Sequence, residues 1–280
     1  MIELIDLSKK FDEFTAVDSL NLNIKTGEFF GLLGPNGAGK STTIGMMSTL
    51  LLPTTGKILI DGEELNRKNS KLKRKISVVT QEYSMRQDMT IDEVMEYQGR
   101  LYYMPRKVIK EKSCELLEFC GLRQYRKRTV RKLSGGMKRK LMVCRALLTD
   151  PEILLLDEPT AGMDALARRQ MWNLLKRLNQ NNFTILLTTH YMEEAEALCD
   201  RVALMDKGRI DEIDTPEAMI RDLGKYAVDI TGSDNLNSSY FKTKENAIEY
   251  ISGLDKDAGL RNTTLEDVFL TKIGKHLSSK

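Results

Sequence analysis

Short apolar runs alternate with polar or glycine-rich breaks along most of the chain. We predict strands at 2–7, 20–24, 28–33, 57–60, 76–80, 153–156, 184–188 and 202–205. Segments 40–50 and 164–178 have the pattern of helices, and the second of them separates two strands. Strands that are apolar throughout and alternate with helices are typical of a parallel sheet covered on both faces. The fold class is therefore α/β.

The middle of the chain has a helical pattern instead. The segment from Thr90 to Glu93 has the sequence of a capping box, and Pro105 can open a further helix that ends before Gly121. We interpret about 88–150 as a helical subdomain inserted into the sheet-containing core.

The pattern becomes less regular after residue 214. A capped helix begins at 215–217, and 232–239 is a polar region. We interpret 215–280 as a small C-terminal α+β appendage on a main domain that covers 1–214.

Composition and charge narrow the classes of function. The 280 residues are 41% hydrophobic and 30% charged, which is ordinary for a globular protein and too polar for an integral membrane protein. A formal net charge of +3 argues against a surface built to neutralise a nucleic-acid backbone. The apolar runs are far shorter than the roughly 20 residues that span a bilayer, and the N-terminus has neither a secretory signal nor a lipidation motif. We expect a cytosolic protein, and the scattered cysteines give no reason to assign a metal site to them.

A glycine-rich stretch between the strand at 28–33 and the helix at 40–50 matches the P-loop pattern G-x-x-x-x-G-K-[ST]. Its residues are Gly34, Pro35, Asn36, Gly37, Ala38, Gly39, Lys40 and Ser41. Such a loop turns its N–H groups around phosphate oxygens, and the following helix adds positive charge at its N-terminus. Lys40 is predicted to reach the β- and γ-phosphates, Ser41 to bind Mg²⁺, and Thr42 to contact the nucleotide. A glycine-rich turn without a ligand is the alternative.

Two carboxylates follow the apolar strand at 153–156. In a parallel sheet, Asp157 and Glu158 would lie at the carboxyl edge, which is the edge of the P-loop. Asp157 is predicted to hold Mg²⁺ through water, and Glu158 to orient the water that attacks the γ-phosphate. Without the P-loop, a strand followed by a polar turn would be the better interpretation.

The segment 133–137 is a second candidate for phosphate binding. Its residues Ser134, Gly135 and Gly136 precede an apolar helix, so their N–H groups would lie at a helix N-terminus. One loop already occupies the near side of the nucleotide, so this segment would serve a nucleotide held by a second copy of the chain. A simple helix cap is the alternative.

Several single residues and two basic clusters have ambiguous roles. His190 follows the strand at 184–188 and can donate to the γ-phosphate or be structural. Gln81 can contact Mg²⁺ or water, and Phe11 can stack on adenine or belong to the core. The basic clusters at 68–75 and 123–132 can bind nucleic acid, or be solvated loops and a protein-docking face.

The order in which these motifs follow one another along the chain resembles that of the nucleotide-binding subunit of ATP-binding-cassette (ABC) transporters, over about 1–214. The resemblance implies a P-loop NTPase core of RecA-like type that binds ATP and Mg²⁺. It also implies that Phe11 stacks on adenine, Gln81 is the Q-loop residue, Asp164 is the D-loop aspartate and His190 is the switch histidine. In the signature loop at 133–137, Met137 replaces the family's frequent glutamine, which puts only the contacts of that side chain in doubt.

The segment from Thr264 to Leu270 looks like one found in cassettes of drug, polysaccharide and related exporters, whose permease is a separate chain. The resemblance then implies that two copies pair head to tail, enclose two ATP molecules and act on two permease subunits at the inner face of the cell membrane. No nucleic-acid partner is expected. A soluble cassette protein acting on ribosomes or DNA would need two cassettes or a coiled-coil insert, and an unrelated P-loop kinase or GTPase would lack Leu-Ser-Gly-Gly. The cargo cannot be read from this chain.

Overall fold

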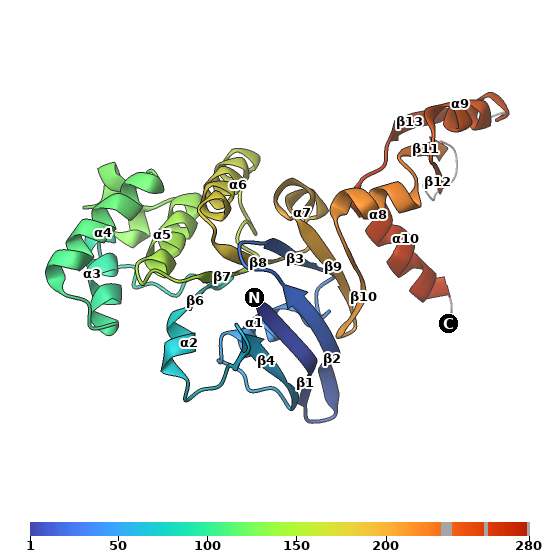
Figure 1. The fold of residues 1–280 in the computed structure, drawn as a ribbon. Helices are drawn as coiled ribbons and strands as arrows, with labels where there is room; N and C mark the ends of the chain where they lie inside the picture. Colours follow the sequence, from blue (N-terminus) through green and yellow to red (C-terminus); the bar gives the residue numbers. More distant parts are fainter. Residues whose placement is uncertain (231–236, 255–256, 279–280) are drawn as a thin grey trace.

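The central element of the computed structural model is a six-stranded sheet with the order β10-β9-β3-β8-β7-β6 (Figure 1). The structure describes residues 1–230, 237–254 and 257–278. The strands of this sheet are β3 (Phe29–Leu33), β6 (Ile76–Val79), β7 (Ile153–Asp157), β8 (Thr184–Thr189), β9 (Arg201–Asp206) and β10 (Arg209–Asp214). All neighbours pair in parallel except β9 and β10. The predicted α/β fold with a parallel sheet is confirmed.

Alternate side chains of the parallel strands supply two separate hydrophobic cores. In β7, Leu154 and Leu156 belong to one core, whereas Ile153 and Leu155 belong to the other. The first core is covered by α5 (Gly135–Leu147), α6 (Ala165–Gln180) and α7 (Met192–Leu198). The second lies under α1 (Lys40–Met47) and an antiparallel sheet, on the opposite side of the central sheet (Figure 1).

The antiparallel sheet has the order β2-β1-β4-β5. Its strands are β1 (Ile2–Phe11), β2 (Phe14–Ile24), β4 (Thr55–Ile60) and β5 (Glu63–Glu64), and the short α2 (Ser70–Arg74) follows them. Strands β1 and β2 are longer than predicted because one face is buried and the other exposed, so polar residues interrupt the apolar pattern. The sequence analysis missed β5 and α2, which are too short to show a period.

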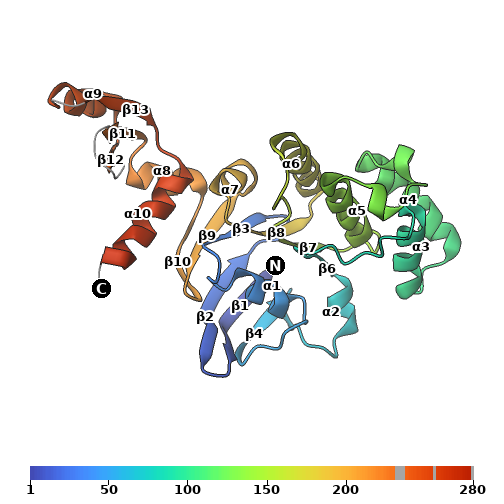
Figure 2. The same cartoon turned by 180° about the vertical axis from the view of Figure 1, so that it is seen from behind.

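The helices of the middle segment gather at one end of the molecule (Figures 1 and 2). They are α3 (Ile91–Leu101), α4 (Arg106–Phe119), two 3₁₀ turns at Arg123–Tyr125 and Val130–Lys132, and α5. The predicted capping box is present: Thr90 accepts from the Glu93 N–H, and the Glu93 carboxylate accepts from the Thr90 N–H at 2.7 Å. Helix α4 begins directly after Pro105 and ends before Gly121, as predicted. The boundaries 88–150 of the subdomain remain a prediction.

The C-terminal residues project from the other end, beyond β9 and β10 (Figures 1 and 2). They form α8 (Pro216–Leu223), β11 (Tyr226–Ile230), β12 (Asn237–Phe241), α9 (Lys244–Ser252), β13 (Ala258–Asn262) and α10 (Leu265–Ser278). The strands make an antiparallel sheet with β11 in the middle. Most of the polar region predicted at 232–239 lies outside the described residues. The division at 214/215 remains a prediction.

Helix α10 joins the C-terminal sheet to the body of the protein. Its residues Leu265 and Val268 are buried in the first hydrophobic core, and the Leu265 N–H donates to Glu196 on α7 at 3.2 Å. The Arg261 guanidinium of β13 bonds to Asp229 and to Asp267 of α10. Burial opposes ionisation of Asp267, but hydrogen bonds from Arg261 and Thr264 lower its pKa to about 2. The segment from Thr264 to Leu270 therefore attaches the C-terminal sheet to the body of the protein.

Within the described ranges, every helix is too short or too polar to span a bilayer.

Candidate nucleotide-binding site

The P-loop connects β3 to α1, and its backbone requires glycine. Gly39 is the N-cap of α1 with φ +104°, and a Cβ there would lie 2.5 Å from the Ala16 carbonyl oxygen. At Gly34, a Cβ would lie 2.1 Å from the backbone oxygen of Met205. Because Gly39 has no side chain to cap α1, the first N–H groups of the helix remain directed toward the loop, where an anion can bind them.

Lys40 lies buried inside this loop. Its ammonium donates to the carbonyl oxygens of Gly34 at 2.8 Å and Pro35 at 3.0 Å. Burial lowers the pKa of Lys40, and the nearby carboxylates of Glu158 and Asp157 oppose that shift. The loop therefore holds a cation directly beside the carboxylates that end β7.

Two of the three predicted metal ligands are in contact. The Ser41 hydroxyl donates to the Asp157 carboxylate at 3.0 Å, and Thr188 on β8 donates to the same oxygen at 2.6 Å. A hydroxyl and a carboxylate are oxygen ligands of the kind Mg²⁺ binds. The third predicted ligand, Gln81, donates instead to Glu158 at 3.3 Å. The residues present thus fit a small oxygen-bound cation between Ser41 and Asp157.

Glu158 contacts two of the other side chains that are predicted to be catalytic, Gln81 and His190. Its carboxylate contacts Gln81 on one oxygen, and the other oxygen lies 3.1 Å from His190 Nδ1. Its backbone has φ +46°, a value that residues other than glycine rarely adopt. The Glu158 N–H donates to the carbonyl oxygen of Thr188 at 3.0 Å, which ties the turn to β8. Such a backbone persists only where the surrounding structure fixes it.

Part of the P-loop lines a pocket of about 350 Å³ together with Gln81 and Glu158, whereas Asp157 and His190 are not among its described lining residues. Its lining residues are Phe14, Ala16, Asn36, Gly37, Gly39, Lys40, Ser41, Thr42, Gln81 and Glu158. The sequence analysis missed Phe14, whose ring is largely exposed at this site. Phe14 is the register partner of Phe11 across the β1–β2 hairpin, and Phe11 lies outside the lining. Adenine stacking by Phe11 therefore remains a prediction, with Phe14 as a second aromatic candidate.

Two further predicted motifs lie apart from this pocket. Among the described lining residues, none comes from the N-termini of α5 and α6, where Ser134, Gly136 and Asp164 lie. Ser134 accepts from the Met137 N–H at 3.3 Å, and Asp164 accepts from the Ala167 N–H at 2.8 Å, so both act as helix caps. A Cβ on Gly136 would lie 3.2 Å from the Ala167 side chain, which places the two helix starts side by side.

A family model described as ABC transporter matches residues 17–161, about half of the chain. The chain is 37% identical over 297 residues to Nod factor export ATP-binding protein I of Rhizobium sp. (strain N33), covering 99% of this chain and 98% of that protein. It is 38% identical over 224 residues to linearmycin resistance ATP-binding protein LnrL of Bacillus subtilis (strain 168), covering 80% and 72%. The chain belongs to the ABC transporter family.

Solved cassettes of this ABC family have the same fold. The dimeric post-hydrolysis structure of the ATP-binding cassette MJ0796 with ADP and Pi aligns with a TM-score of 0.69 at 29% identity, over 77% of this chain and 98% of that one. The structure of cbiO1 from Clostridium perfringens, part of the transporter complex cbiONQ, aligns at 0.72 and 27% identity, over 78% and 89%. The P-loop NTPase core is thereby confirmed, and the chain is an ABC-type ATPase.

Proposed function

We propose that this ABC ATPase powers export through a separate membrane permease, in pairs that close on two ATP molecules. One observation carries the proposal. The P-loop pocket and the N-termini of α5 and α6, which are both predicted to contact nucleotide, lie apart within one chain. Relatives named for Nod factor export and linearmycin resistance support the direction of transport. The test is whether the purified chain associates with membranes only when its neighbouring permease is co-expressed.

We also propose a role in hydrolysis for each side chain of the site. The amides around Gly37 and the Lys40 ammonium would hold the β- and γ-phosphates. Ser41 and Asp157 would hold Mg²⁺, which neutralises charge as the terminal bond breaks. Glu158, which contacts Gln81 and His190, would orient the attacking water, and His190 would donate to the γ-phosphate.

A second copy would complete the site with its α5 and α6 N-termini. The Ser134 and Gly136 N–H groups would face the γ-phosphate of the partner's ATP, and Asp164 would lie at the junction between copies. The dimeric MJ0796 cassette supports pairing, and the head-to-tail arrangement is our proposal.

Substituting Gly136 by Asp tests this arrangement. A carboxylate at the start of α5 would repel the γ-phosphate, so we expect ATP-driven dimerisation to be lost while the monomer binds ATP within about threefold of wild type. Light scattering after size-exclusion chromatography, in a Glu158→Gln background, measures the dimer. Gly253→Asp, at an exposed glycine with φ −92°, is the control. A persistent Gly136→Asp dimer would contradict the proposal.

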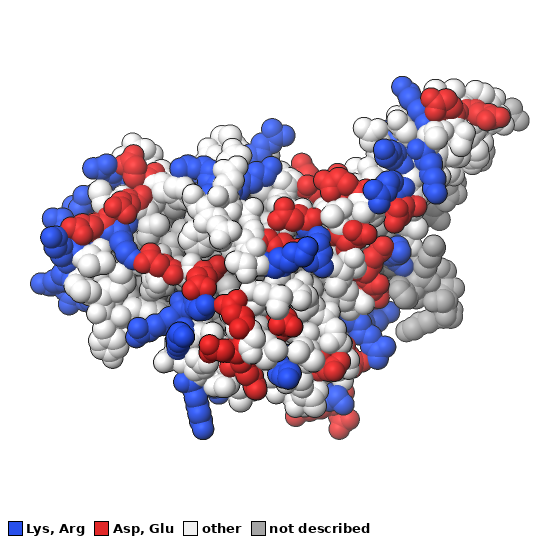
Figure 3. Space-filling view, viewed as in Figure 1, with Lys and Arg blue, Asp and Glu red and all other residues white. Residues whose placement is uncertain are grey.

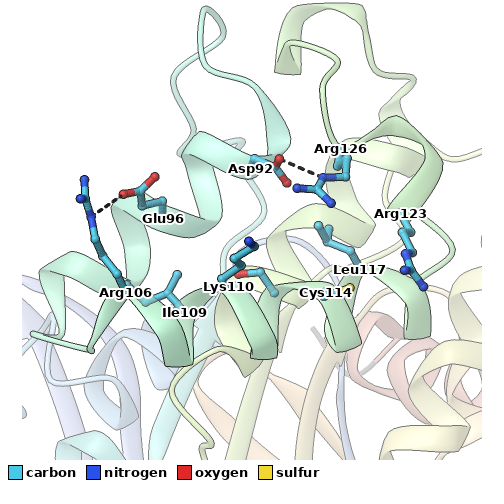
Figure 4. Close-up of a pocket in the computed structure, with 10 residues that line it drawn as sticks. Asp92, Glu96, Arg106, Ile109, Lys110, Cys114, Leu117, Arg123 and Arg126 are labelled. Carbon is cyan, nitrogen blue, oxygen red and sulfur yellow. Dashed lines mark hydrogen bonds and ion pairs between the residues drawn. The ribbon is translucent and has the colours of Figure 1, made fainter.

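A groove between α3 and α4 is the surface that we propose for the permease (Figure 4). It has a volume of about 340 Å³, with Ile109 and Leu117 at its floor and side chains of both charges around it. Exposed aromatic and aliphatic residues lie on the second half of α3 and directly after it: Tyr97, Leu101, Tyr102 and Tyr103. An exposed apolar area with a charged rim is typical of an interaction site. This contact would hold the chain at the inner face of the cell membrane.

Reversing one charge of the groove tests the docking surface. Lys110 lines the groove, whereas Lys107, three residues earlier on the same exposed helix, does not. We expect Lys110→Glu to reduce co-purified permease about tenfold, with the ATPase rate of the isolated chain unchanged. Lys107→Glu should retain the permease. Equal retention by both variants would exclude this surface.

The basic clusters do not favour nucleic acid. Arg126 and Lys127 pair with Asp92, Arg123 pairs with Glu118, and Lys75 pairs with Asp61 and Glu152. Acidic residues lie among the basic ones over the face shown in Figure 3. These pairs favour the alternative interpretation of the clusters, as solvated loops and a protein-docking face.

A further inference from the structure

Glu194, four residues after His190, has a fully buried carboxylate. It belongs to α7, which begins two residues after His190. One of its oxygens accepts from the Thr160 hydroxyl at 2.8 Å and from the Trp172 indole N–H at 3.0 Å. Burial raises the pKa of Glu194, and hydrogen bonds from Thr160, Thr189 and Trp172 oppose that shift.

The partners of Glu194 come from the segments that carry the reacting groups. Thr160 is in the tight turn after β7, in which the Ala161 N–H donates to the Glu158 carbonyl oxygen at 3.2 Å. Trp172 is on α6, which begins after Asp164. Glu194 therefore joins the turn after Glu158, the helix after the D-loop and the helix after His190.

The contacts of Glu194 help to explain the unusual backbone of Glu158. Glu158 has φ +46°, and its carboxylate lies 3.1 Å from His190. A residue other than glycine keeps a left-handed backbone where contacts on both sides of it fix the conformation. The Thr188 contact fixes the turn on the strand side, and the Thr160–Glu194 bond fixes it on the helix side.

We propose that Glu194 is a positioning residue for ATP hydrolysis, which sets the geometry of Glu158 and His190 through Thr160 and α7. The inference rests on the roles proposed above for Glu158 and His190. Glu194 does not need to exchange a proton or contact ATP, because it acts through hydrogen bonds that it accepts. Its amide counterpart should therefore function nearly as well.

Four variants test the proposal. Glu194→Leu and Thr160→Val each remove the bond between α7 and the turn, so we expect kcat to fall about 10- to 100-fold with the KM for ATP within about threefold of wild type. The double variant should be no worse than the more affected single one, because both changes break the same contact. Glu194→Gln retains an acceptor oxygen, and its kcat should stay within about threefold of wild type.

The adjacent Glu193→Gln is the matched control, because Glu193 is exposed on the same helix and the variant loses the same charge. Its kcat should equal that of wild type. Circular dichroism gives the folded fraction, and Thr160→Val, which keeps the side-chain shape, carries the test if Glu194→Leu does not fold. Unchanged kcat in Thr160→Val, additive losses in the double variant, or a KM that rises with the fall in kcat would overturn the proposal.

Glu158→Gln measured in parallel separates two kinds of failure. If Glu158→Gln hydrolyses ATP normally, the proposed role of Glu158 fails. If Glu158→Gln is inactive while Thr160→Val is fully active, only the positioning role of Glu194 fails.

Discussion

Glu158→Gln should reduce the kcat of ATP hydrolysis about 10²- to 10³-fold and leave ATP affinity within about threefold of wild type. The amide retains the shape of the carboxylate and its place beside Gln81 and His190, but it cannot accept a proton from the attacking water. The P-loop residues that are proposed to hold the phosphates are unchanged. Phosphate release under saturating ATP measures the rate, and equilibrium binding of a fluorescent ATP analogue measures affinity.

The same variant should accumulate as a nucleotide-bound dimer, because in the proposed cycle the pair opens only after hydrolysis. Light scattering with and without ATP and Mg²⁺ tests this directly. Glu63→Gln, on the exposed strand β5, is the charge-matched control and should turn over ATP at the wild-type rate. Normal turnover by Glu158→Gln would remove Glu158 from the mechanism.

Lys40→Ala should abolish measurable ATP binding, with a loss of affinity of about 100-fold or more. Hydrogen bonds to charged groups contribute about 1.5–3 kcal/mol each, and Lys40 is predicted to contact two phosphates. The site would also lose the only side-chain cation among the described residues that line the pocket. Isothermal titration calorimetry with Mg-ATP measures the change.

Lys57→Ala is the control for this loss of charge, because Lys57 is exposed on β4, in the antiparallel sheet. It should bind ATP as wild type does. Since Lys40 also bonds to the carbonyls of Gly34 and Pro35, the thermal unfolding of both variants should be compared. A folded Lys40→Ala protein with unchanged nucleotide affinity would contradict the phosphate-binding role.

The parallel sheet could be predicted because its strands are buried on both faces and therefore apolar throughout. Strand β7, for example, has all five residues buried. The antiparallel sheet could be predicted only in part, because only the second half of β2, at 20–24, alternates buried and exposed residues, and its first half lacks this pattern. The short β5 and α2 depend on tertiary contacts, which leave little trace in the local sequence.

The order of motifs predicted most of the candidate site, but not its contacts. Ser41 and Asp157 are 116 residues apart, and only the fold shows that they are hydrogen-bonded. Phe14 was missed because an isolated aromatic residue carries no signal, although it lies three residues after Phe11. Glu194 could not be singled out, since nothing in the sequence indicates that Thr160 and Trp172 bond to it.

The docking of α10 has a consequence for how the chain can be shortened. Leu265 and Val268 fill the same hydrophobic core as the β7 residues Leu154 and Leu156. A protein that stopped at residue 214 would therefore present an uncovered apolar surface next to α7, the helix that follows His190. Because the last helix contributes to a core built mainly from a distant part of the sequence, we expect the C-terminal segment and the body to unfold together.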